Sequence, residues 1–140
     1  MTNEELLALI DARSAADAAF AALVAERADV AIAEALSKGR TKLVPTEVGV
    51  GTILATLGDG GGAFLDTLVD IGTVNRNVHW TMVLINDGRL RIDLPATRSA
   101  MSALAAAVPA LSQAIAALLT LGYAPDPVSW TQVAAALGSR

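Results

Sequence analysis

The sequence predicts an all-α protein, a small bundle of about five to seven helices. Of its 140 residues, 54% are hydrophobic but only 4% are aromatic. Most apolar side chains are therefore small, with 29 alanines among them, and alanine is the residue that most favours helix. In addition, apolar residues recur at spacings of three and four along most of the chain.

The length predicts one domain, because domains cluster near 100 to 150 residues. We expect a single helical domain over residues 1–140. Within it, residues 1–40 form an N-terminal helical arm and residues 41–140 a helical core. Residues 41–48 contain Pro45 and several β-branched side chains, which favour an extended crossing between arm and core.

The arm begins with a capping box. Thr2 and Glu5 have the spacing at which each side chain accepts a hydrogen bond from the other residue's backbone amide, so a helix should begin at about residue 3. Residues 14–17 (Ser-Ala-Ala-Asp) offer a second cap, where the helix bends or restarts. Gly39 closes the region.

Two helices are expected next. Residues 52–57 fit a short buried helix that stops at Gly58, although their length alone leaves a strand open. Apolar residues resume helical spacing over residues 63–72. Between them, Gly60, Gly61 and Gly62 predict a flexible turn.

Residues 75–93 are ambiguous. The alternation of side-chain character in residues 78–85, followed by the turn residues Asn86-Asp87-Gly88, is typical of a β-hairpin. An isolated hairpin is only marginally stable, however, and no other convincing strand exists to extend it. We therefore expect a helix over residues 76–86 and an extended piece around 89–93, while a short hairpin near 86–93 stays open as the alternative.

The clearest pattern lies toward the C-terminus. Six apolar residues step by three and four, as in a helix packing seam: Met101, Leu104, Val108, Leu111, Ile115 and Leu118. Pro109 interrupts this seam, because proline inside a helix removes a hydrogen bond and clashes with the preceding turn. We expect two antiparallel helices, the first capped by Asp93 with Pro95 in its first turn and ending near Ala107. A last helix follows a capping box at Ser129.

Composition excludes some functions. The net charge of −4 and the pI near 4.8 remove the electrostatic attraction on which nonspecific nucleic-acid binding depends. The absence of cysteine excludes disulfides and zinc–thiolate sites. Residues 99–125 carry no charge and are long enough to cross a bilayer. They are rich in alanine and contain Pro109, so insertion of residues 99–125 is kept only as an alternative.

Reactive chemistry is sparse. The glycines lack the spacing of a phosphate-binding loop, and no serine hydrolase motif is present. His79 is the only histidine, and Asp87 and Asp93 follow it closely. A small hydrolase or ligand-binding protein using His79 with a nearby aspartate is thus a second alternative. We predict no catalytic, metal or cofactor site.

Five residues are candidates for contacts with a partner. Trp80 and Trp130 combine a large apolar area with a polar N–H, a combination enriched at interfaces. Arg89, Arg91 and Arg98 lie within a dozen residues of one another, close to aspartates. These guanidinium groups either pair internally or bind carboxylates of a partner, and the sequence leaves both open.

Several short phrases resemble a known class of protein. They are Gly39-Arg-Thr-Lys-Leu-Val-Pro-Thr-Glu-Val-Gly-Val-Gly-Thr52, Val78-His-Trp-Thr-Met82, and Leu94-Pro-Ala-Thr-Arg98 before an alanine-rich helix. Over most of residues 1–137 the chain resembles small helical proteins encoded among the virion-structural genes of tailed bacteriophages. The resemblance implies a noncatalytic virion component of tail, baseplate or neck. It implies binding to copies of itself or to neighbouring virion proteins. It also implies a location in the virion, with the host cytoplasm as the site of assembly. It supplies no active site.

Overall fold

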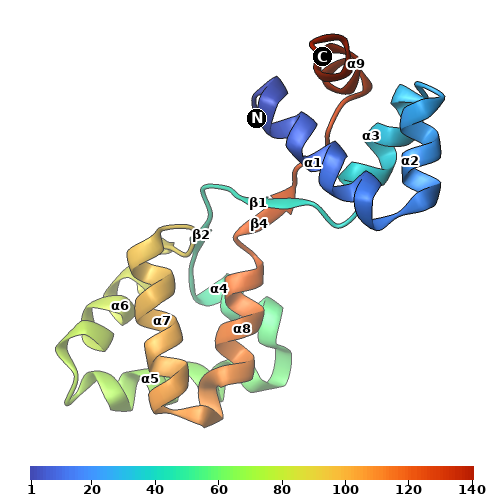
Figure 1. Cartoon of the computed structure of the whole chain (residues 1–140). Coiled ribbons are helices and arrows are strands. Elements are labelled where there is room, and N and C mark those ends of the chain that lie inside the picture. Colours follow the sequence, from blue (N-terminus) through green and yellow to red (C-terminus); the bar gives the residue numbers. More distant parts are fainter. The chain divides into compact units, whose positions relative to one another are not determined.

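The helices account for most of the chain. The computed structural model describes all 140 residues and is all-α apart from four short strands (Figure 1). The α-helices are α1 (Asn3–Ala16), α2 (Ala18–Ala25), α3 (Asp29–Ser37), α4 (Val50–Leu57), α5 (Gly61–Gly72), α6 (Arg76–Asn86), α7 (Pro95–Ala107), α8 (Ser112–Thr120) and α9 (Trp130–Gly138). Nine α-helices exceed the five to seven that the sequence predicts, because the N-terminal region is divided into three helices.

The remaining elements are short. Two 3-10 helices, η1 (Gly58–Gly60) and η2 (Pro109–Leu111), lead into α5 and α8. The strands are β1 (Thr41–Leu43), β2 (Glu47–Val48), β3 (Leu90–Arg91) and β4 (Tyr123–Pro125). β1 pairs with β4, and β2 pairs antiparallel with β3, with Val48 opposite Leu90. The extended crossing at 41–48 and the extended piece at 89–93 are confirmed.

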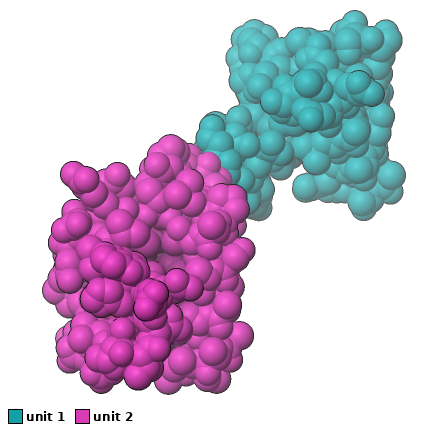
Figure 2. Space-filling view, turned by 90° about the vertical axis from the view of Figure 1, so that its left-hand side faces the viewer, with its two compact units in different colours: residues 1–42, 125–140 teal, residues 43–124 magenta.

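The chain forms two compact units (Figure 2). Unit 1 consists of residues 1–42 and 125–140, and unit 2 of residues 43–124. The sequence assigns residues 125–140 to a core of 41–140, whereas in the structure they pack with residues 1–42. The physical reason is the apolar face of α9, where Val133 and Leu137 are buried among the side chains of α1 and α3.

Unit 1 is built from α1, α2, α3 and α9. The capping box of Thr2 and Glu5 is present, and α1 ends where Asp17 caps α2 through the amides of Ala19 and Phe20. The cap of α2 is therefore Asp17. Ser37 fixes the segment that leads into α9, since its hydroxyl accepts a hydrogen bond from the Val128 amide at 2.8 Å.

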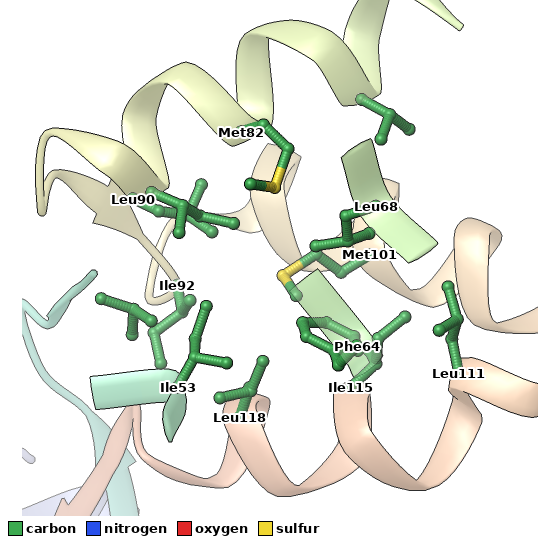
Figure 3. Packing of buried hydrophobic residues seen from close by; sticks show 13 residues of the cluster. Ile53, Phe64, Leu68, Met82, Leu90, Ile92, Met101, Leu111, Ile115 and Leu118 are labelled. Atoms are coloured by element: carbon green, nitrogen blue, oxygen red, sulfur yellow. The ribbon is translucent and has the colours of Figure 1, made fainter. Parts of the chain in front are cut away.

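Unit 2 contains α4 to α8 and has its own core. Buried side chains from each of these helices and from β2 and β3 converge on one cluster (Figure 3). All six seam residues belong to this core, four of them buried and Leu104 and Val108 partly buried. As predicted, α7 ends at Ala107, and a new helical segment begins with Pro109 in its first turn. The helix over residues 76–86 is also confirmed.

Two local predictions are wrong. The glycines at 60–62 do not form a flexible turn, because η1 ends at Gly60 and both Gly61 and Gly62 lie in the first turn of α5. Asp93 does not cap α7. Leu94 occupies the N-cap position without a side-chain hydrogen bond, since the Asp93 carboxylate is already bonded elsewhere in unit 2.

The uncharged stretch 99–125 is interrupted several times. It comprises most of α7, then η2, α8 and part of β4. No helix in the structure has both the length and the apolar composition that spanning a bilayer requires.

Candidate functional site

The charged side chains of unit 2 are unevenly distributed. Neither α4 nor α8 contains a charged residue, and α7 contains only Arg98. All other charged residues of the unit lie on β2, η1, α5, α6 and residues 87–93. α8 packs against both α4 and α7. The three helices, which together carry only one charged residue, are therefore neighbours.

Exposed residues on these three helices are small, apolar or polar without charge. We call them the uncharged surface, and they include Leu54, Ala55 and Thr56 on α4, Ser99, Ser102 and Ala106 on α7, and Gln113, Ala116 and Thr120 on α8. An ordinary protein surface is about 25–35% charged, whereas the cores of protein interfaces are depleted in charged residues. The uncharged surface therefore has the composition of a contact region.

A groove of 570 Å³ lies between α6 and α7. Its floor consists of core side chains, among them Leu68, Ile85 and Met101. One wall is formed by α6 and the other by α7, which contributes four exposed alanines: Ala96, Ala100, Ala103 and Ala107. None of the groove's lining residues is charged.

The two candidate tryptophans are both exposed. Trp80 is 58% exposed on α6, and Trp130 is 55% exposed at the start of α9 in unit 1. Trp80 lies one helical turn from Leu84, a residue that lines the groove and is itself 43% exposed. Trp80 is thus close to the groove, whereas Trp130 belongs to the other unit.

The three candidate arginines have different environments. Arg89 is exposed and makes no salt bridge. Arg91 binds Asp93 in a bidentate manner, with Nε–Oδ1 and Nη2–Oδ2 distances of 2.7 and 2.6 Å. Asp93 also accepts a hydrogen bond from the Thr46 amide at 3.0 Å. Arg91 is therefore engaged within unit 2, while Asp93 links the chain after β3 to the chain before β2 through the Thr46 amide.

Arg98 is also engaged internally. Its Nη1 donates to the carbonyl oxygens of Ile92 and Leu119, both at 3.0 Å. Its guanidinium lies over the ring of Tyr123, 4.9 Å from the ring centroid. Leu119 is in the last turn of α8, where a positive charge complements the helix dipole. Arg98 thus connects the segment before α7 to the end of α8.

The Asp93 contacts predict a pH dependence of stability. The Arg91 guanidinium, together with the Thr46 amide, holds the pKa of Asp93 well below its usual value. A carboxyl whose pKa is lower in the folded state stabilises the fold above its unfolded pKa of about 3.9, and this stabilisation is lost as the pH falls toward the folded pKa. In urea unfolding, the free-energy difference between wild type and Asp93→Asn is expected to shrink below about pH 4.

The matched control for this prediction is Asp66→Asn. Asp66 is exposed on α5 and makes no salt bridge, so this variant should follow the wild-type pH profile. If the difference in free energy of unfolding between wild type and Asp93→Asn stayed constant from pH 7 to below about pH 4, the prediction would be contradicted.

The structure does not bring His79 together with an aspartate. His79 is exposed on α6, and its ring lies edge-on to Trp80, with 5.1 Å between the centroids. Asp87 follows eight residues later at the end of the same helix, a rise of roughly 12 Å. The Asp93 carboxylate is bonded to Arg91 and Thr46. The structure also has no group of three or more histidine or carboxylate side chains positioned to hold a metal ion.

The groove residues are the ones that sequence reasoning missed. Ala96, Ala100, Ala103 and Ala107 step by four, three and four, in parallel with the apolar seam of the same helix. This second stripe was visible in the sequence. The sequence also predicted the helix over residues 76–86, but it did not show that this helix and α7 would form the two walls of a groove.

Comparison with known proteins identified no relative. No family model matches the chain, and neither the curated proteins nor the solved structures contain a match.

Proposed function

We propose that this chain is a noncatalytic assembly protein that binds copies of itself or neighbouring structural proteins through the uncharged surface of unit 2. The observation that carries the proposal is the absence of any charge on α4 and α8 and the single, internally bonded charge on α7. A surface without charges is poorly hydrated, so covering it with another protein costs little desolvation.

The proposal includes a place in the virion of a tailed bacteriophage. This part is supported by the phrases at residues 39–52, 78–82 and 94–98, which resemble virion-structural proteins. A protein of tail, baseplate or neck would be made in the host cytoplasm and then incorporated into the particle. Its partners would be other virion proteins and copies of the chain.

Introducing a charge into the uncharged surface tests the assembly function. Ala116 is exposed in the middle of α8, and Ala116→Glu preserves helix propensity while placing a carboxylate there. Buried without a partner, this carboxylate should weaken association by about 3 kcal/mol, more than a hundredfold in Kd. Size-exclusion chromatography with light scattering measures the change in mass, and circular dichroism checks the fold.

The matched control is Ala8→Glu on α1, also an exposed helical alanine. It should leave the mass of the assembly unchanged. A wild-type chain that runs at 14.3 kDa and copurifies with no structural protein would contradict the function. The virion location is tested separately by the neighbouring reading frames: portal, tail-tube or fibre proteins support it, and metabolic enzymes contradict it.

A further inference from the structure

Positive charge gathers around one cleft of unit 1. This cleft of 430 Å³ lies between the second half of α1 and the residues at and after the end of α3. Its floor includes Leu36, a buried residue of the unit 1 core, and Leu9, which packs against that core. None of its lining residues is acidic, and three are cationic: Arg13, Lys38 and Arg40. We call it the basic cleft, and it occurs in a chain whose net charge is −4.

The cations of the basic cleft are incompletely paired. Lys38 is exposed and makes no salt bridge. Arg40 bonds Asp126 through Nε alone, at 3.1 Å. Arg13 approaches Asp17 through Nε at 3.6 Å. The Nη groups of both arginines and the Lys38 ammonium therefore retain N–H donors that an added carboxylate can accept.

The same cations do not hold the helix ends as Arg98 does. Arg98 donates to the Leu119 carbonyl in the last turn of α8. Arg13 lies in the last turn of α1 and Lys38 is the C-cap of α3, yet neither side chain donates a hydrogen bond to a carbonyl. Their charges complement the helix dipoles, but this leaves their hydrogen-bonding capacity unused within unit 1.

α5 carries charges of the opposite sign. Residues 43–75 contain four acidic residues and neither lysine nor arginine. Asp66 and Asp70 are exposed one helical turn apart on α5, and neither makes a salt bridge. Val69 lies beside them and is 52% exposed. We call Asp66, Val69 and Asp70 the acidic face.

The acidic face opposes the local preferences of its own helix. Carboxylates four residues apart on a helix repel each other. Asp70 also lies in the last turn of α5, where the helix dipole favours a positive charge. The stability of α5 therefore does not account for either aspartate, whereas an external cationic partner would.

We propose that the basic cleft binds the acidic face of α5 of a second copy. In this contact Asp66 and Asp70 pair with the cationic rim, and Val69 covers part of the apolar floor. The inference rests on the proposed function, for which it names a second copy as the partner. Charge complementarity selects this occupant, because the cleft offers unpaired cations and α5 offers unpaired carboxylates.

Other acidic residues of the chain are less suitable. Glu5 is held in its capping box with Thr2. Five aspartates already make salt bridges: Asp11, Asp17, Asp29, Asp93 and Asp126. Only α5 presents two unpaired carboxylates one turn apart on the same helix face, beside an exposed large apolar side chain.

This contact should be sensitive to salt. Ion pairs at an exposed surface each contribute little, and salt screens them over a few ångströms. Opposite charges across an interface mainly orient the two molecules and accelerate their encounter. A contact through the uncharged surface lacks charges and should not weaken in the same way, so salt separates the two modes of association.

Light scattering of the purified full chain tests the contact. We expect a mass that rises with concentration above 14.3 kDa at about 0.05 M salt, and a Kd about tenfold higher at about 0.5 M salt. Lys38→Glu should raise the Kd at low salt by about tenfold. The control, Arg89→Glu, changes the net charge equally at an exposed residue outside the cleft and should retain most of the association.

Reversing a charge on both sides identifies the occupant. Lys38→Glu combined with Asp66→Lys or with Asp70→Lys leaves the net charge at −4, since the two changes cancel. One of these double variants should restore most of the wild-type affinity by forming a reversed ion pair. Lys38→Glu with Glu26→Lys has the same net charge but leaves α5 unaltered, and it should not restore affinity. Circular dichroism checks that each variant is folded.

The outcomes separate this inference from the proposed function. Failure of both α5 double variants to restore affinity, or equal restoration by the Glu26→Lys control, would overturn the inference. Association that is lost in Ala116→Glu but is insensitive to salt and to Lys38→Glu would also overturn it and leave the proposed function standing. A wild-type chain that is monomeric at low salt and captures no structural protein would contradict both.

Discussion

Replacing Arg98 with methionine is expected to lower the free energy of unfolding of unit 2 by about 2 to 4 kcal/mol. The variant keeps an apolar side chain of similar length but loses the hydrogen bonds to the Ile92 and Leu119 carbonyls. Hydrogen bonds from a charged donor contribute about 1.5 to 3 kcal/mol each. Partial exposure of Arg98 allows water to replace part of this loss. Stacking on Tyr123 is lost as well.

Chemical denaturation followed by tryptophan fluorescence measures this effect. The chain has two tryptophans, so a Trp130→Phe background leaves Trp80 as the reporter of unit 2. Arg89→Met is the matched control, because Arg89 is exposed and makes no salt bridge. Its effect should remain within about 0.5 kcal/mol. Equal effects of the two arginine substitutions would show that Arg98 does not hold the end of α8 in place.

Gly49→Ala is expected to destabilise unit 2 by about 1 to 3 kcal/mol. A Cβ at Gly49 would lie 2.9 Å from the Cα of Gly88, closer than two carbon atoms approach without repulsion. The neighbouring atom belongs to the backbone and cannot rotate away. Relief requires a shift of the turn that leads into β3, and this would disturb the pairing of Val48 with Leu90.

Gly51→Ala is the control for this prediction. Nothing lies within 4 Å of the position that its Cβ would occupy, and the residue is exposed in the first turn of α4. Alanine favours helix over glycine by up to about 1 kcal/mol, so this variant should be at least as stable as wild type. The same denaturation experiment compares the two, and a Gly49→Ala variant as stable as Gly51→Ala would contradict the close approach.

Local signals in the sequence were sufficient for many helix boundaries. The capping boxes at Thr2 and Ser129 form as expected, because they depend on residues three positions apart. Pro109 ends the α7 segment for an equally local reason. The helix at 76–86 required one nonlocal consideration, namely that a lone hairpin lacks a sheet to join.

Pairings between distant segments were not predictable in the same way. The sequence left open whether Arg91 and Arg98 pair within the chain or bind carboxylates of a partner. For Arg98 the outcome depends on where the Leu119 carbonyl lies, twenty-one residues further along the chain. For Arg91 it depends on Asp93, whose carboxylate is also bonded to the distant Thr46 amide. Asp93 has the residue type of a helix cap, yet its contacts with Arg91 and Thr46 prevent this role.

The sequence by itself determined the all-α class, the apolar seam from Met101 to Leu118 and the absence of charge from residues 99–125, since all three follow from composition and periodicity along the chain. Only the tertiary structure decided that residues 125–140 join residues 1–42, and that α6 and α7 enclose an uncharged groove. The physical reason is that an apolar face specifies the need for a partner but not its identity. Close packing among many competing helix faces selects the partner.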